Sequence, residues 1–175
     1  MAELIFDSVN DMFALQYKLN GVDAIVNPCN LVGAAGKGLS KEFQKRYSKN
    51  YAEYYRACKE HSIGIGENLV VKLQDKSNYS TPRFVINLAT KNHYAENSRA
   101  LFVERGLKCL VKNIKKYEIK TLIIPRLGCG LGNLNFDLTV RPLMVSYLKD
   151  PDIDCKIYVS ADYKPTKIFK PVGFR

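Results

Sequence analysis

Short apolar runs alternate along the chain with longer segments in which apolar residues recur every three or four positions. The short runs are rich in Val, Ile, Leu and Phe, which predicts strands that are largely buried. These runs occupy residues 2–6, 22–26, 69–73, 83–88, 122–124 and 154–160. The longer segments predict amphipathic helices. They occupy residues 11–19, 37–47, 50–61, 97–117 and 141–148.

Regular alternation of strands and helices is typical of the α/β class. We therefore predict a three-layer α/β/α sandwich with a mixed, mostly parallel sheet. Ligands of such sheets lie beyond the carboxyl ends of the strands, so the loops that follow the strands form the candidate site. The 175 residues fit one domain, which we place at residues 1–160. Residues 161–175 have no periodicity and are predicted to form a basic C-terminal tail.

Polar residues and one proline predict where three helices begin. Residues 7–10 are expected to cap the first helix, and Ser98 is expected to cap the helix over residues 97–117. Asn135 is expected to cap the last helical segment. Since proline is tolerated only in a first helical turn, Pro142 predicts that the regular helix begins near Arg141.

The composition excludes disordered and membrane-spanning proteins. Apolar residues make up 46% and charged residues 25% of the chain, which is typical of a soluble globular protein. No apolar run approaches the roughly 20 residues that a membrane-spanning helix needs. The start of the chain shows no basic segment followed by an apolar one, as a secretory signal would. We expect a cytoplasmic protein that has no membrane partner.

The five cysteines and two histidines show no metal or disulfide pattern. The number of cysteines is odd and no two form a Cys-x-x-Cys pair, so we predict no metal site and no disulfide framework. Cys29 and Cys129 lie in glycine-rich loops, where a thiol could act as a nucleophile. No histidine stands near either in sequence to activate it, which favours a role as a small residue beside a ligand.

The formal net charge of +10 favours a polyanionic partner such as nucleic acid, although solubility alone would also explain it. The basic residues are concentrated in residues 37–49, 112–120 and 164–175.

Two glycine-rich loops carry the candidate chemistry. Residues 33–38 (GAAGKG) follow the strand at 22–26, and residues 128–132 (GCGLG) follow the strand at 122–124. Because glycine has no Cβ, backbone N–H groups in such loops can approach phosphate oxygens closely, and a helix N-terminus adds a positive dipole end. Two such loops facing one ligand predict a compound with two phosphates.

Several motifs in this order resemble those of macrodomains, which bind ADP-ribose. Residues 26–30 (VNPCN) with the first glycine loop resemble the first macrodomain signature, and residues 125–131 (PRLGCGL) resemble the second. Further segments are similar to the macrodomain branch that contains DarG, an antitoxin that removes ADP-ribose from thymidine in DNA. These are residues 36–39 (GKGL), 57–59 (ACK), 87–93 (NLATKNH), 98–99 (SR) and 128–134 (GCGLGNL). The resemblance covers about residues 20–148.

The resemblance implies an ADP-ribosyl glycohydrolase that reverses DarT-type modification of thymidine. Its partners would be ADP-ribosylated DNA and ADP-ribose, with a DarT-like toxin as its antagonist, no cofactor and a monomeric state. In that branch the lysine of a Thr-Lys-x-His loop is needed for activity, and here it is Lys91. Asn30 would lie by the distal ribose and act with Lys91, and Asp7 would accept the adenine amine. The implied ligand contacts are Asp7, Asn27, Gly33, Gly36, Lys37, Gly38, Gly128, Cys129, Gly130 and Leu131.

Two chemical roles are open for Lys91. Hydrolysis at C1″ of the distal ribose passes through an oxocarbenium-like state, for which related hydrolases use carboxylates, but residues 33–38, 90–93 and 128–132 contain none. A nearby pyrophosphate favours the ammonium form, which could protonate or stabilise the leaving thymine. Alternatively, the neutral amine could attack the ring-opened sugar to give a Schiff base. His93 is expected to fix the loop by a hydrogen bond rather than to act as a base.

Other functions remain open at this point. A related protein-directed glycohydrolase has Asp where this chain has Gly132, which weighs against hydrolysis of carboxylate-linked ADP-ribose. The substrate could be another ADP-ribose derivative, such as the 1″-phosphate, an O-acyl ester or an RNA-phosphate adduct, or the domain could be a non-catalytic reader. For DNA, the basic segments would contact phosphates without sequence choice. A modified base must enter a site, so single-stranded or unstacked DNA is expected.

Overall fold

The computed structural model describes residues 1–7 and 10–161, so most of the predicted basic tail lies outside the described residues. The strands are β1 (Glu3–Phe6), β2 (Ala24–Cys29), β3 (Asn68–Lys72), β4 (Phe84–Ala89), β5 (Thr121–Ile124) and β6 (Lys156–Val159). The helices are α1 (Met12–Lys18), α2 (Gly38–Arg46), α3 (Ser48–Lys59), α4 (Ala100–Lys116), the π-helical η1 (Phe136–Val140) and α5 (Arg141–Leu148).

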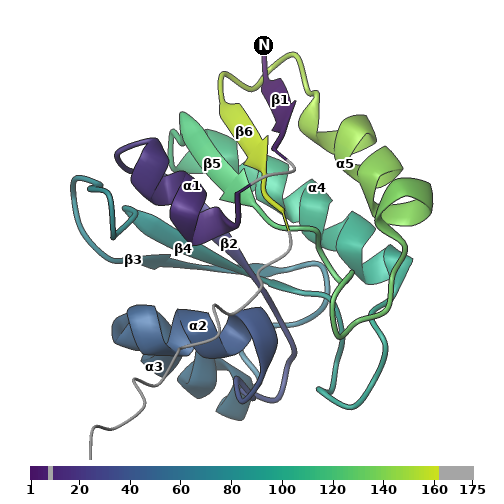
Figure 1. Cartoon of the computed structure of the whole chain (residues 1–175). Helices are drawn as coiled ribbons and strands as arrows, with labels where there is room; N and C mark the ends of the chain where they lie inside the picture. Colours follow the sequence, from purple (N-terminus) through teal and green to yellow (C-terminus); the bar gives the residue numbers. More distant parts are fainter. Residues whose placement is uncertain (8–9, 162–175) are drawn as a thin grey trace, which may run out of the picture.

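The six strands form one sheet in the order β1-β6-β5-β2-β4-β3 (Figure 1). All neighbouring strands are parallel except β3, which pairs antiparallel with β4 at one edge. The predicted mixed, mostly parallel sheet is therefore confirmed. The pairing of β2 with β5 is limited to Ala24 with Leu122 and Ile25 with Ile123, whereas β4 follows β2 as far as Cys29. Beyond Ile25 the two central strands are thus no longer paired, and each leads into one of the glycine loops.

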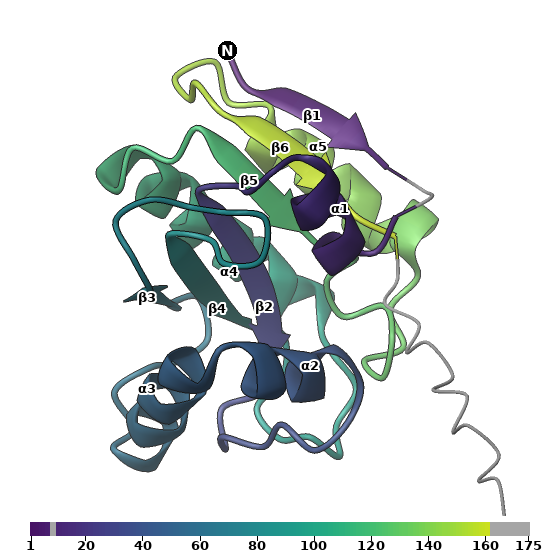
Figure 2. The same cartoon turned by 60° about the vertical axis from the view of Figure 1, so that its left-hand side comes forward.

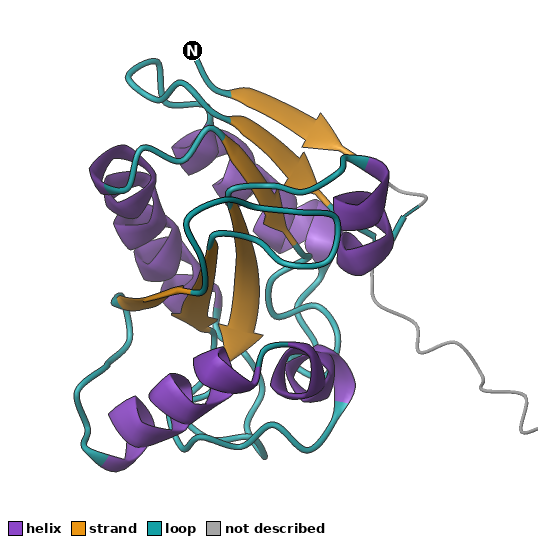
Figure 3. Cartoon of the chain, turned by 90° about the vertical axis from the view of Figure 1, so that its left-hand side faces the viewer, coloured by secondary structure: helices purple, strands orange, loops and turns teal. Residues whose placement is uncertain are grey.

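Helices cover both faces of the sheet, which confirms the predicted sandwich (Figure 2, Figure 3). On one face, Leu107 and Leu110 of α4 and Met144 of α5 pack in a fully buried core with the strands. On the other face, Phe13 of α1 and Phe43 of α2 pack in a second buried core. This double coverage explains why the strands read as continuous apolar runs rather than alternating ones.

One of these helix starts differs from the sequence expectation and the other agrees with it. The N-cap of α1 is Asp11, whose carboxylate accepts hydrogen bonds from the N–H groups of Phe13 and Ala14, both at 2.9 Å. The predicted cap within residues 7–10 is therefore wrong. Asn135 does cap η1, since its Oδ1 accepts from the Leu138 N–H at 2.9 Å, and α5 begins at Arg141 as predicted.

Candidate active site

The first glycine loop is held in shape by the side chain of Asn30. Its Oδ1 accepts hydrogen bonds from the backbone N–H groups of Val32 at 3.1 Å and Ala34 at 3.2 Å, and its Nδ2 donates to the Ala34 carbonyl at 2.9 Å. The Tyr54 hydroxyl lies 3.0 Å from the same Oδ1 and 2.9 Å from the Asn30 carbonyl. Asn30 is only 5% exposed. These contacts give Asn30 a structural role in the loop that the sequence did not reveal.

The second glycine loop packs closely against Ser98, and this packing requires two of its glycines. A Cβ on Gly132 would lie 2.2 Å from the Ser98 Oγ, and a Cβ on Gly128 would lie 2.9 Å from the Ser98 Cβ. Gly128 also has a φ of 70°, which disfavours other residues. The Ser98 N–H donates to the Gly132 carbonyl at 2.9 Å. An Asp at position 132 would not fit this arrangement, in agreement with the departure noted in the sequence.

Two other glycines have no such structural explanation. A Cβ on Gly36 or on Gly130 would meet no atom within 4 Å, and neither residue adopts a positive φ. Both residues are exposed. Neither the backbone conformation nor the packing therefore requires glycine at these two positions. Close approach of a ligand to the backbone would require it.

The two loops are neighbours in space. A Cβ on Gly38, at the start of α2, would lie 3.5 Å from the Cδ1 of Leu131 in the second loop. The loops follow β2 and β5, which are adjacent strands of the sheet. One ligand can therefore contact both loops, as the two-phosphate prediction requires.

Lys91 reaches the second glycine loop from the loop that follows β4. Its Nζ donates to the Glu96 carbonyl at 3.1 Å and lies 3.5 Å from the Leu131 carbonyl. Partial burial lowers the pKa of the Lys91 ammonium from its usual 10.5, and the nearby Glu96 carboxylate opposes this shift. The ammonium is thus placed beside residues predicted to surround a diphosphate.

The start of α4 ties the Lys91 loop to the second glycine loop. The Ser98 Oγ donates to the Thr90 Oγ1 at 2.9 Å, and the Arg99 N–H donates to the Thr90 carbonyl at 3.2 Å. The N-cap of α4 is Arg99 and has no side-chain cap, so the prediction that Ser98 caps this helix was wrong. His93 fixes its own loop as predicted, because its Nδ1 accepts from the Ala95 N–H at 3.2 Å.

Asn27 belongs to a buried cluster of three amides beneath the first loop. The Oδ1 of Asn87 accepts from the Nδ2 of Asn27 at 2.9 Å and from the Nδ2 of Asn50 at 3.1 Å. Asn87 in turn donates to the Oδ1 of Asn50 at 2.8 Å. All three residues are at most 3% exposed. Sequence reasoning missed Asn50 and Asn87, and it placed Asn27 at the ligand surface, whereas the side chain is buried.

The remaining candidates lie at separate points of the site. Asp7 follows β1, and its carboxylate accepts from the N–H and the Nδ2 of Asn10 at 3.0 and 3.2 Å. Lys37 is exposed and is the N-cap of α2. Burial strongly raises the pKa of the Cys29 thiol, and the Cys129 Sγ lies 3.4 Å from the Leu127 carbonyl. A thiol held neutral is a poor nucleophile, which favours the structural reading of Cys29.

The strand order places these candidates along one edge of the sheet. Asp7 follows β1, the two glycine loops follow β5 and β2, and Lys91 follows β4. With neighbouring strands about 4.8 Å apart, β1 and β4 are separated by roughly 19 Å along this edge. This separation is longer than a diphosphate, so Asp7 and Lys91 would contact the groups attached to the two ends of the diphosphate. In the described residues, no group of three His, Cys, Asp or Glu side chains could hold a metal ion.

None of the helices in the described part of the chain combines the length and apolarity that a membrane span needs.

Known proteins with similar sequences are DNA ADP-ribosyl glycohydrolases. The protein of that name from Mycobacterium tuberculosis is 33% identical over 136 residues, which cover 78% of this chain and 38% of the relative. Its counterpart from Thermus aquaticus is 37% identical over 113 residues, which cover 65% of this chain and 31% of the relative. The chain therefore spans less than two fifths of the length of these curated relatives.

Solved structures point to the same proteins. The macrodomain of Mycobacterium tuberculosis DarG has a TM-score of 0.77 and 29% identity, with 90% of this chain and 98% of that chain covered. The Thermosipho africanus DarTG structure in complex with ADP-ribose also has a TM-score of 0.77 and 29% identity, with 93% and 43% covered. These matches confirm the resemblance to DarG macrodomains that the motifs indicated. Since the family model of the Macro domain matches residues 26–143 as well, the chain belongs to the macrodomain family.

Proposed function

We propose that this chain hydrolyses the bond between ADP-ribose and thymidine in single-stranded DNA and so reverses the action of a DarT-like toxin. The observation that carries the proposal is the position of the Lys91 Nζ, 3.5 Å from the Leu131 carbonyl of the second glycine loop. A diphosphate bound by the two loops would place its distal ribose towards Lys91, on the side of β4. The adenosine would extend along the sheet edge towards Asp7, on the side of β1.

The two loops would bind the diphosphate mainly through backbone N–H groups. Gly36 and Gly130 leave their backbone open to such an approach, and Lys37 adds an exposed positive charge beside the first loop. Asn30 would act by keeping the N–H groups of the first loop in place, and Asn27 by supporting the loop from below. This assignment replaces a direct catalytic contact for Asn30 with a positioning role.

Lys91 would act as the proton donor. As the bond between C1″ and the base nitrogen breaks, its electron pair stays with thymine, and the Lys91 ammonium supplies the proton that neutralises the base. Water then adds to C1″ to give free ADP-ribose, and the proton that this water releases restores the Lys91 ammonium. We favour this role over a Schiff base because the Lys91 Nζ donates to two backbone carbonyls, a set of contacts that suits an ammonium group. Borohydride trapping under turnover tests the choice, since a covalent adduct at Lys91 would support the Schiff base.

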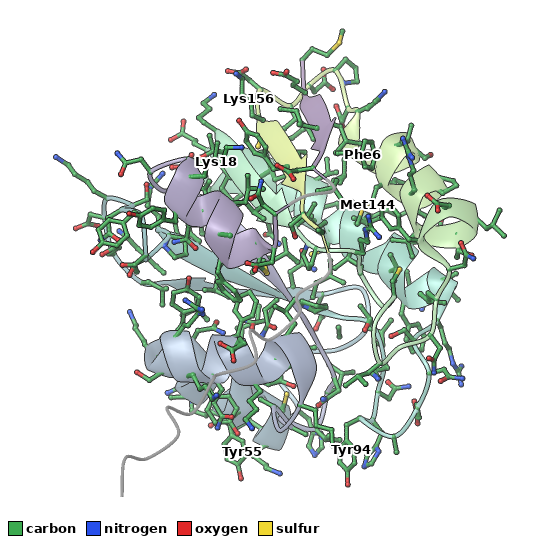
Figure 4. All side chains as sticks on the ribbon, in the orientation of Figure 1. Phe6, Lys18, Tyr55, Tyr94, Met144 and Lys156 are labelled. Carbon is green, nitrogen blue, oxygen red and sulfur yellow. The ribbon has the colours of Figure 1, made fainter. Side chains whose placement is uncertain are left out.

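The decisive experiment compares Lys91→Ala with wild type on an oligonucleotide carrying ADP-ribosyl-thymidine. Loss of a general acid is expected to slow release by about 10²–10⁴-fold. Calorimetry should show that the variant still binds ADP-ribose, because the backbone N–H groups are intact. Lys156→Ala is a matched control, since Lys156 begins β6 at the opposite end of the molecule (Figure 4).

The other outcomes separate the alternative functions. Wild-type release from a different ADP-ribose derivative, but not from DNA, would assign the site to that derivative. Tight ADP-ribose binding without turnover of any substrate would identify a reader. A Lys91→Ala protein that is as active as wild type would refute the proposed chemistry.

A further inference from the structure

We propose that the adjoining rings of His93 and Tyr94 form a platform for the nucleobase next to the modified thymidine. This inference rests on the proposed function and adds a specificity-determining contact to it. The two ring centroids are 4.1 Å apart with an interplanar angle of 34°, and Tyr94 is 61% exposed. The pair therefore presents an aromatic surface of two mutually inclined rings, and the Tyr94 side faces solvent.

The platform belongs to the same short loop as Lys91. The Lys91 Nζ donates to the Glu96 carbonyl at 3.1 Å, so the ammonium contacts the chain just beyond the two residues that carry the rings. With consecutive Cα atoms 3.8 Å apart, the Cα atoms of Lys91 and Tyr94 are at most about 11 Å apart. Bases that follow one another in a strand are separated by about 3.4 Å when stacked. A base one or two positions from the modified thymidine is thus within reach of the rings.

Hydrogen bonds within the loop fix the His93 ring and the backbone around Tyr94 before any ligand binds. The Nδ1 of His93 accepts from the Ala95 N–H at 3.2 Å, and the His93 carbonyl accepts from the Glu96 N–H at 3.1 Å. The other end of the loop is fixed by the Leu31 N–H, which donates to the Asn92 carbonyl at 3.0 Å. An aromatic pair that is already ordered loses little conformational entropy when a base stacks on it.

Stacking on an exposed aromatic surface selects for unpaired strands without selecting a sequence. Every nucleobase has a π-face, so any base could occupy the platform. A base within a duplex has both faces covered by its neighbours, so it must leave the stack first. The platform therefore explains how a site with mostly backbone contacts to ADP-ribose could distinguish modified DNA from free ADP-ribosyl-thymidine.

The location of the platform agrees with this role. Tyr94 lies at the same end of the molecule as Tyr55 of α3 and far from Lys156 at the start of β6 (Figure 4). A second exposed aromatic pair offers a comparison, because Tyr17 and Tyr79 are in contact with ring centroids 5.4 Å apart. Tyr79 lies between the end of β3 and the start of β4, which is the opposite end of β4 from the Lys91 loop.

The test compares kcat/KM on two substrates, an ADP-ribosylated single-stranded oligonucleotide and the ADP-ribosyl-thymidine nucleoside. In Tyr94→Ala, the ratio of oligonucleotide to nucleoside kcat/KM should fall about tenfold, the amount expected for one lost base–aromatic stack. Tyr94→Phe should keep most of the ratio, and Tyr79→Ala should keep all of it. Two further oligonucleotides carry an abasic residue directly 5′ or directly 3′ of the modified thymidine. One of them should lower the oligonucleotide-to-nucleoside ratio of kcat/KM for wild type and leave that ratio nearly unchanged for Tyr94→Ala.

The outcomes separate this inference from the function on which it rests. If wild type releases ADP-ribose but Tyr94→Ala keeps the wild-type ratio, the platform is refuted and the proposed function stands. The platform is also refuted, and the proposed function stands, if neither the 5′ nor the 3′ abasic residue changes the kcat/KM ratio of wild type. If wild type releases no ADP-ribose from either substrate, both the proposed function and the platform are refuted.

Discussion

Gly130 and Gly132 stand two positions apart in the second loop, yet alanine should have opposite consequences at the two sites. At Gly132, a Cβ would lie 2.2 Å from the Oγ of the buried Ser98 and 2.5 Å from the Gly128 carbonyl oxygen. At Gly130, it would meet nothing within 4 Å. The first substitution therefore tests packing, and the second tests whether the open backbone serves a ligand.

The expected magnitudes follow from these contacts. Overpacking a well-packed site costs about 1–3 kcal/mol, so Gly132→Ala should lower the free energy of unfolding by that amount. For a chain of this size, the melting temperature should then fall by about 2–12 °C. Gly130→Ala should leave stability unchanged or raise it by up to about 1 kcal/mol, because alanine restricts the unfolded chain. Loss of one hydrogen bond to a charged phosphate costs about 1.5–3 kcal/mol, which is about 10–100-fold in the ADP-ribose dissociation constant.

Two measurements on each variant are sufficient. Thermal unfolding without ligand reports stability, and calorimetry with ADP-ribose reports binding. We expect a stable Gly130→Ala protein that binds ADP-ribose weakly and a destabilised Gly132→Ala protein. Wild-type affinity in Gly130→Ala would refute the claim that ligand approach explains this glycine. An unchanged melting temperature in Gly132→Ala would show that the loop relaxes around the new methyl group.

Three further predictions test other parts of the structure. Burial lowers the pKa of Lys91 below 10.5, so a reaction that needs the ammonium should slow as pH rises through that lowered value. The measurement is kcat/KM as a function of pH, and a value of kcat/KM that rises there would favour the Schiff base. Asn87→Ala leaves the buried amides of Asn27 and Asn50 without partners, so the free energy of unfolding measured in urea should fall by at least about 1–3 kcal/mol; a smaller loss would contradict the hydrogen-bond assignment. Asp11→Ala removes the cap of α1 and should cost about 0.5–2 kcal/mol in the same urea assay, with no effect on ADP-ribose binding.

Much of the fold could be predicted because strands covered on both faces leave a clear mark in the sequence. The run at residues 122–124 is apolar throughout and the run at residues 83–88 is mostly apolar, and they match β5 and β4 closely. The two glycine loops could be found for a related reason, since glycine at several nearby positions is rarely needed for packing alone. Their contact through Gly38 and Leu131 followed from parallel strands whose carboxyl ends share one edge.

Other features depend on partners that sequence patterns cannot reveal. The partners of the Asn87 amide are 60 and 37 residues away in the chain, at Asn27 and Asn50, and a polar residue in an apolar run does not identify them. Ser98 looks like a helix cap because of its place before α4, but its hydroxyl bonds to Thr90 instead. Strand β2 also extends to Cys29, past the apolar run, because residues 27–29 stay paired with residues 87–89 of β4.

Leu131 contacts both the start of α2 and the Lys91 side chain. Its side chain adjoins the start of α2, and its carbonyl lies within reach of the Lys91 ammonium. We therefore expect a movement of the second loop to shift the position of the Lys91 side chain. A nucleotide that orders the loop also narrows the range of positions open to the amine. Substrate fragments without phosphates should hence lose turnover as well as affinity, since remote binding energy is then no longer available to align the reacting groups.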